Sequence, residues 1–158
     1  MIAGIVIGVT IIVAVTVLAG AAWFAVDSDK RVRKFARSTD LVPGRAGRAP
    51  QEWTTSASVE ARLHRRIRYA VADVHQNPAI PHDPGLVAAR DRLDAAIFDL
   101  DDKLIAAAQL PADAKEIELE SIESAIRELE ELPKKLWEAP ADRQRIDIDE
   151  IIGLIGRV

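Results

Sequence analysis

Residues 2–26 have the sequence IAGIVIGVTIIVAVTVLAGAAWFAV, which contains no charged side chain. A bilayer core is about 30 Å thick, so a helix needs roughly 20 apolar residues to cross it. In lipid the backbone must satisfy its own hydrogen bonds, which favours a helix even where Ile and Val dominate. Trp23 and Phe24 end the stretch, where aromatic rings favour the headgroup layer. Residues 1–26 are therefore predicted to form one transmembrane helix.

A cleaved signal peptide is the alternative interpretation, with the small residues Ala19, Gly20 and Ala21 as its cleavage site. Three features oppose it: no Lys or Arg precedes the stretch, the stretch is long for a signal peptide, and positive charge follows it. The chain has no cysteine, which excludes a lipoprotein anchor. A permanent anchor is the favoured interpretation.

A cluster of basic residues follows the predicted span: Lys30, Arg31, Arg33, Lys34 and Arg37. By the positive-inside rule, this cluster places the N-terminus outside and the rest of the chain in the cytoplasm. We therefore expect a single-pass protein of the cell membrane. Anionic lipid would attract such a cluster by about 1 kcal/mol per basic residue, which makes membrane lipid an expected partner. For the cluster itself, a topology signal without further function is the favoured interpretation.

Small residues recur along the predicted span: Gly4, Gly8, Thr16, Ala19 and Gly20. Faces of small residues let transmembrane helices approach one another closely. The span is therefore predicted to pack against helices of other integral membrane protein subunits.

The charge is divided unevenly along the rest of the chain. Residues 27–68 contain 11 basic and 5 acidic residues, whereas residues 69–158 contain 10 basic and 20 acidic residues. These oppositely charged halves would pair with each other or with partners of opposite sign.

The length after residue 26 suffices for one small domain, and the absence of cysteine suits a reducing cytoplasm.

Residues 27–55 are predicted to form a basic juxtamembrane segment and an irregular connector. The connector contains helix-breaking residues, namely Pro43, Gly44, Gly47 and Pro50. Residues 56–139 are predicted to form a helical domain. Its first helix begins with Ser56 or Ser58 as N-cap and ends before Asn77 and Pro78.

Two further helices complete this predicted domain. Asp83 followed by Pro84 is a strong helix start, and the second helix is expected to end near Gln109. The third helix covers about residues 112–132, is rich in glutamate, and is ended or kinked by Pro133. Each helix has one narrow apolar stripe, so the predicted fold class is all-α: the transmembrane helix followed by a bundle or hairpin of about three helices.

Residues 140–158 form an apolar C-terminal tail with two interpretations of its structure. Ile146 and Ile148 alternate with acids as in an edge strand, whereas one or two helical turns capped by Asp149 suit the residues Ile151, Ile152, Leu154 and Ile155. The tail either folds back to complete the bundle core, which is favoured, or docks in a groove of a partner.

No catalytic or metal-binding motif is apparent in the sequence. His64, His75 and His82 never lie four residues apart, and no nucleophile elbow or phosphate-binding loop is present. The carboxylates Asp99, Asp101 and Asp102 lack the loop geometry that calcium requires and are interpreted as a solvated face. We expect no enzyme activity, no cofactor, no bound metal and no small-molecule substrate.

Three arginines stand out on the first helix of the predicted domain: Arg62, Arg65 and Arg66. Arginine suits phosphate binding, but the chain has a net charge of −4 and the third helix is strongly acidic. No nucleic-acid binding is expected. Pairing of these arginines with the Glu-rich helix, or with an acidic partner, is the simpler account. With the tail residues 151, 152, 154 and 155, they are the candidate partner contacts.

Three parts of the chain carry a family resemblance: the anchor with its MIAGIVIGV and DSDKRVRK segments, the RAGRAP connector, and the ELESIESAIRELEEL helix. Together they resemble small single-span actinobacterial proteins. One such family is the association factor of the cytochrome bc1–aa3 respiratory supercomplex. The resemblance is one of architecture and composition over the whole chain. It implies a structural role beside the oxidase, without haem or copper ligands in the chain.

The sequence therefore predicts a non-catalytic accessory subunit of a bacterial membrane complex, with a respiratory complex implied by the resemblance. The alternative is a membrane-tethered adaptor or regulator that recruits a soluble cytoplasmic partner. An enzyme is disfavoured, because no nucleophile, base and orienting group can be assembled from the sequence.

Overall fold

The computed structural model describes residues 35, 38 and 40–158. The predicted transmembrane helix, its small-residue face and the basic cluster from Lys30 to Arg37 lie outside the described residues. The chain divides into two compact units, residues 1–38 and residues 39–158, and the second contains the packed helices. In the part of the chain that the structure describes, no helix is long and apolar enough to cross a bilayer.

Residues 40–54 form an ordered segment, which we call the strap, where the sequence suggested an irregular connector. The antiparallel strands β1 (Asp40–Val42) and β2 (Arg45–Ala46) are followed by the short 3-10 helix η1 (Gln51–Thr54). Pro43 and Gly44 form the turn between the strands, and Gly44 has a φ of 81°. Proline followed by a residue with positive φ suits a type II turn. The residues that break a helix here therefore make a hairpin.

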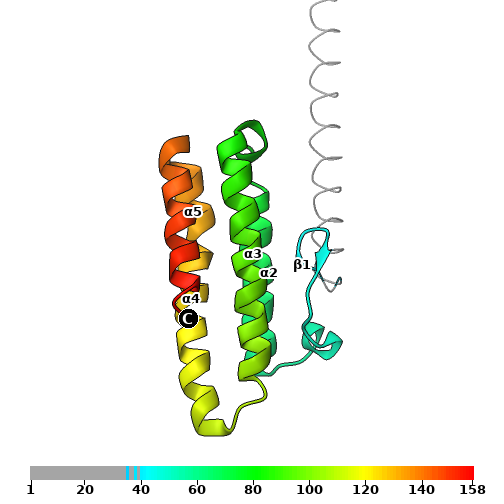
Figure 1. The fold of residues 1–158 in the computed structure, drawn as a ribbon. Helices are drawn as coiled ribbons and strands as arrows, with labels where there is room; N and C mark the ends of the chain where they lie inside the picture. The colour runs from blue at the N-terminus through cyan, green and yellow to red at the C-terminus, as the bar shows by residue number, and fades with distance from the viewer. Residues whose placement is uncertain (1–34, 36–37, 39) are drawn as a thin grey trace, which may run out of the picture. The chain divides into compact units, whose positions relative to one another are not determined.

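Four helices pack as a bundle with alternating directions (Figure 1). They are α2 (Val59–His75), α3 (Pro84–Ala107), α4 (Ala112–Glu138) and α5 (Ala141–Ile155), with the short 3-10 helix η2 (Ile80–His82) before α3. Helix α2 packs against α4, and α5 packs against both α3 and α4. The helical class predicted for this domain is confirmed, but the bundle has four helices rather than about three.

Two helix starts were predictable because their signals are local. The Ser58 side chain accepts a hydrogen bond from the backbone N–H of Ala61. The Asp83 carboxylate accepts from the N–H groups of Gly85 and Leu86, with Pro84 in the first turn of the helix. Both side chains satisfy backbone donors that a helix start leaves unpaired.

The prediction for the last two helices needs correction. Helix α4 continues through Pro133 to Glu138, where the sequence suggested an end or kink. Leu136 lies beyond Pro133 and is buried with Leu132 on the same stripe, so core packing favours continued helix despite the hydrogen bond that proline removes. The edge-strand interpretation of Ile146 and Ile148 is wrong, because both lie within α5.

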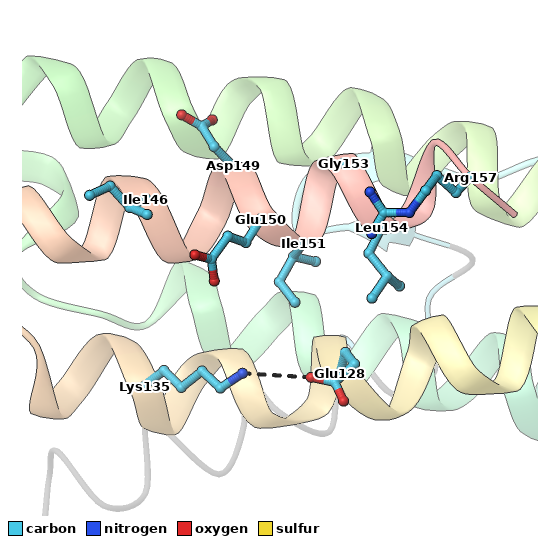
Figure 2. Close-up of a pocket in the computed structure, with 9 residues that line it drawn as sticks. All are labelled: Glu128, Lys135, Ile146, Asp149, Glu150, Ile151, Gly153, Leu154 and Arg157. Atoms are coloured by element: carbon cyan, nitrogen blue, oxygen red, sulfur yellow. Dashed lines mark ion pairs between the residues drawn. The ribbon is translucent and has the colours of Figure 1, made fainter.

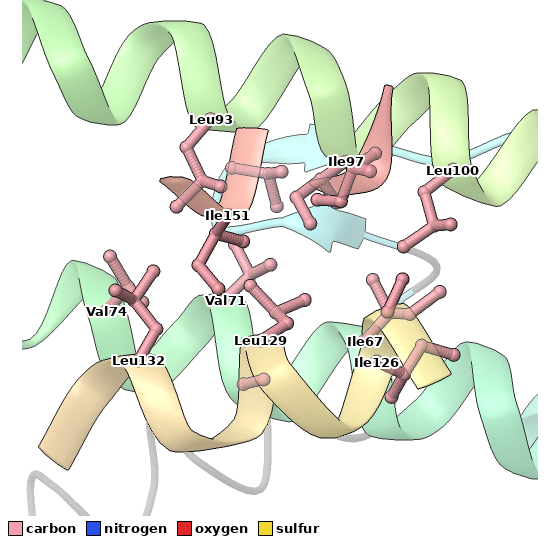
Figure 3. Close-up of a cluster of buried hydrophobic side chains, with 14 of the residues drawn as sticks. Ile67, Val71, Val74, Leu93, Ile97, Leu100, Ile126, Leu129, Leu132 and Ile151 are labelled. Atoms are coloured by element: carbon pink, nitrogen blue, oxygen red, sulfur yellow. The ribbon is translucent and has the colours of Figure 1, made fainter. Parts of the chain in front are cut away.

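The core lies on the bundle axis (Figure 3). Each helix contributes buried side chains: Ile67, Val71 and Val74 from α2, Leu93, Ile97 and Leu100 from α3, Ile126, Leu129 and Leu132 from α4, and Ile148, Ile151 and Ile155 from α5. Helix α5 thus completes the core, which confirms the favoured interpretation of the tail.

Candidate interaction surface on helices α4 and α5

Arg66 joins α2 to the acidic helix α4. Its guanidinium donates two hydrogen bonds of 2.8 Å to the Glu130 carboxylate and one of 2.8 Å to Glu123. These bonds raise the pKa of Arg66, and the hydrogen bonds from Arg66 hold the pKa of Glu130 below its ordinary value. Arg66 therefore pairs within the chain, as expected if the basic helix binds the Glu-rich one.

Glu130 gives this ion-pair network a defined pH dependence. Because its pKa is lower in the folded chain than in the unfolded chain, its contribution is present above the unfolded value and is lost as the pH falls through the folded value. The pair is partly exposed, so we expect Glu130→Gln to cost about 0.5–1 kcal/mol at pH 7. The two chains should converge in stability once the pH falls below the lowered pKa that Glu130 has in the folded chain. Thermal unfolding followed by circular dichroism measures this, and a difference that persists at acid pH contradicts it.

Arg65 and Arg68 hold the strap against α2. Arg65 Nη1 donates to the carbonyl oxygens of Trp53 and Ser56 at 2.6 and 2.8 Å. Arg68 Nε donates to the carbonyl of Asp40 at 2.6 Å, and burial lowers the pKa of its guanidinium. Arg65, a predicted partner contact, thus holds the chain's own backbone, whereas Arg62 is exposed.

Side chains of the strap add three further contacts to the bundle. Trp53 is buried and meets the His64 ring edge-on, with 5.7 Å between ring centroids. The Arg45 guanidinium lies over the Phe98 ring at 4.6 Å, and Arg48 pairs with Asp102 at 2.6 Å. The strap is therefore attached to α2 and α3 along its length.

Two histidines form pairs inside the bundle that the sequence did not reveal. His64 Nδ1 lies 2.6 Å from the Asp101 carboxylate, and both side chains are buried. His75 Nε2 lies 2.9 Å from Asp94. Within residues 40–158, no group of three or more His, Cys, Asp or Glu side chains is placed to hold a metal ion.

The three carboxylates Asp99, Asp101 and Asp102 do not form one cluster in the structure. Asp101 pairs with buried His64, Asp102 pairs with Arg48 of the strap, and Asp99 is exposed. Consecutive positions on a helix point in different directions, which separates the group. The interpretation as a solvated face therefore fits Asp99 and not Asp101.

A groove of about 540 Å³ lies between α4 and α5 (Figure 2). Two of the predicted contact residues of the tail line it: Ile151, buried in the floor, and Leu154, which is partly exposed. Its lining comprises Glu128, Lys135, Ile146, Asp149, Glu150, Ile151, Gly153, Leu154 and Arg157. Of the remaining tail candidates, Ile155 lies in the core and Ile152 packs beside it.

Charged side chains surround this apolar floor. Lys135 lies 3.6 Å from Glu128 on α4, Glu150 lies 3.5 Å from Arg143, and Asp149 lies 2.7 Å from Arg92 on α3. An apolar floor with charged edges is typical of surfaces that bind a protein segment. We therefore consider the groove the candidate interaction surface.

Other apolar side chains are exposed on the same two helices. Ile117 and Trp137 of α4 are 70% and 63% exposed, and Ile146 of α5 is 49% exposed. Large exposed apolar residues are common at protein interfaces, with aromatic residues enriched there. Sequence periodicity could have indicated Ile117, which lies off the apolar stripe of its helix.

Comparison of the chain with protein-family models, with curated proteins and with solved structures found no match.

Proposed function

We propose that this chain is a non-catalytic accessory subunit of a bacterial membrane complex. Residues 1–26 would anchor it in the cell membrane, with the N-terminus outside and the bundle on the cytoplasmic side. The observation that supports this proposal best is the attachment of the strap to α2 by Arg65, Arg68 and Trp53, and to α3 by Arg45 and Arg48.

The strap matters because it shortens the link between the proposed anchor and the bundle. If residues 40–54 were a loose connector, the bundle would reach far from the membrane, as suits an adaptor. Because the strap is packed on the bundle, only residues 27–39 separate it from the proposed span. A short link suits a subunit that packs beside the cytoplasmic parts of its partners.

The partners we propose are membrane lipid and integral membrane subunits. The proposed span would pack through Gly4, Gly8, Thr16, Ala19 and Gly20. The resemblance to the supercomplex association factor points to a respiratory complex. The bundle would contribute its exposed face on α4 and α5.

A membrane-tethered adaptor is the second candidate. The exposed Ile117 and Trp137 favour it, because two large apolar side chains facing solvent are a suitable contact for a soluble protein. In that case Ile117→Ala and Trp137→Ala would release the partner, and changes in the span would not.

Purification of the full-length chain in a mild detergent tests the main proposal. We expect integral membrane subunits to co-purify, with a haem absorbance spectrum if the complex is respiratory. Gly4→Leu with Gly8→Leu should remove these subunits, whereas the matched pair Val6→Leu and Val9→Leu should retain them. Recovery of soluble partners only, unaffected by the span, would contradict the accessory-subunit proposal.

A further inference from the structure

Four charged side chains stand at the corners of the groove between α4 and α5. They are Glu128 and Lys135 on α4, and Glu150 and Arg157 on α5 and the turn that follows it. Each helix has an acid followed, seven positions later, by a base. Seven residues are about two helical turns, so the backbone positions of each pair lie on one side of their helix about 10 Å apart. The long side chains of Lys135 and Glu128 bring their charged atoms to 3.6 Å of each other within the chain.

Because α4 and α5 run in opposite directions, the order of the charges reverses across the groove. Glu150 lies at the same end as Lys135, and Arg157 lies at the same end as Glu128 (Figure 2). The signs therefore alternate around the four corners. The apolar floor of Ile151 and Leu154 lies between them.

From this pattern we propose that the groove is a self-association surface that pairs with the same groove of a second copy of this chain. A two-fold dimer brings one surface patch onto itself, so the patch must be self-complementary. With the two-fold axis across the helices, Glu150 faces the second copy's Arg157 and Lys135 faces its Glu128. With the axis along the helices, Glu150 faces the second copy's Lys135 and Arg157 faces its Glu128.

The charge of the groove favours this occupant over a strongly charged partner. The four corner charges cancel, and the fifth charged residue of the lining, Asp149, is paired with Arg92 at 2.7 Å. Glu150 also lies 3.5 Å from Arg143, an exchangeable ion pair because both side chains are more than half exposed. A basic or acidic partner would therefore meet attraction at two corners and repulsion at the other two. A copy with the same alternating pattern meets attraction at all four.

Gly153 lies in the α5 side of the groove lining and provides room there for the second copy. A Cβ added at Gly153 would meet only the end of the Arg157 side chain, at 3.8 Å. Packing within the chain therefore does not require glycine at this position. Glycine inside a helix costs about 0.5–1 kcal/mol relative to alanine, so its presence here opens the groove at the expense of helix stability.

The substitution Gly153→Leu distinguishes a role of Gly153 in self-association from a role in folding. The substitution should preserve the thermal stability of the monomer, because the added side chain meets open groove and helix propensity improves. We expect it to weaken self-association of the full-length chain, reconstituted in nanodiscs or mild detergent, by at least about tenfold, or 1.4 kcal/mol. The matched control is Gly156→Ala at the end of α5, outside the groove lining, which should leave association unchanged.

Charge reversal distinguishes the two axes and provides a rescue. Glu150→Lys alone should weaken association by about tenfold under either axis. Adding Arg157→Glu to the same chain should restore it if the axis lies across the helices. Adding Lys135→Glu should restore it if the axis lies along them. Restoration by neither double variant would overturn the proposal.

Crosslinking places the contact at the groove rather than in the predicted span. The natural sequence has no cysteine, so a single introduced cysteine is unique. Ile146→Cys, at the edge of the groove, should crosslink copies through a short bifunctional maleimide, and this crosslink should disappear in the Gly153→Leu background. Tyr69→Cys on α2 should give no crosslink. Equal crosslinking at both positions, crosslinking that survives Gly153→Leu, or a monomeric chain would each overturn the proposal, whether or not other subunits co-purify.

Discussion

Replacing Ile148 with alanine is expected to lower the free energy of unfolding by about 2–4 kcal/mol. Ile148 is fully buried in the core that α5 shares with α3 and α4, so the shorter side chain loses apolar contacts and leaves a cavity. Ile146 lies two residues earlier in the same helix and is 49% exposed. Ile146→Ala should change stability by less than about 0.5 kcal/mol.

The comparison of these two variants distinguishes a helix from a strand. In a strand, side chains two positions apart lie on the same face, so the two substitutions would have similar effects. In a helix they point in directions about 160° apart, and only one faces the core. Urea unfolding of the full-length chain in mild detergent, followed by circular dichroism, measures both variants. Equal losses would contradict the fold of α5.

The ambiguity of α5 illustrates a limit of sequence patterns. Ile146 and Ile148 alternate with acids, while Ile148, Ile151 and Ile155 repeat at helical spacing. A short apolar segment often satisfies both periods, and its own residues cannot decide between them. The decision comes from the apolar faces of α3 and α4, against which only a helix buries Ile148, Ile151 and Ile155 together.

The features that sequence predicted well depend on neighbouring residues. Ser58 and Asp83 bind N–H groups two or three positions away, and the stripe of α3 follows from spacing alone. The strap depends on distant residues instead. Arg68 binds the carbonyl of Asp40, and Arg48 pairs with Asp102, 54 positions away. No local sequence pattern indicates partners that are distant in sequence, so the connector was predicted to be irregular.

The candidate surface was predictable only in part for the same reason. The apolar residues of the tail indicated a contact region, and Ile151 and Leu154 do line the groove. The other side of the groove comes from Glu128 and Lys135 of α4, which stand in a glutamate-rich sequence that suggests only a solvated face. The alternating signs become apparent only when the two helices lie antiparallel.

Asp101→Ala is expected to destabilise the bundle by about 3–5 kcal/mol, the largest effect of any single polar substitution proposed for this chain. Asp101 is 1% exposed, and its carboxylate lies 2.6 Å from Nδ1 of buried His64. Removing the carboxylate leaves a polar ring nitrogen in the core without this partner, and the unfolded chain would solvate that nitrogen freely. The matched control is Asp102→Ala, since Asp102 pairs with Arg48 at the surface and should contribute less than about 1 kcal/mol.

Replacing both His64 and Asp101 should lower the free energy of unfolding much less than removing the Asp101 carboxylate alone. The second oxygen of Asp101, Oδ2, is buried, and among residues 40–158 it has no hydrogen-bond partner, so the pair itself retains a desolvation penalty. Apolar residues of similar volume remove both the pair and that penalty. His64→Leu combined with Asp101→Leu should therefore recover most of the stability lost in Asp101→Ala. Urea unfolding of His64→Leu, Asp101→Leu and the double variant that combines them gives the coupling energy directly. Equal losses for Asp101→Ala and Asp102→Ala, or losses that simply add in the double variant, would show that the buried pair does not couple α2 to α3.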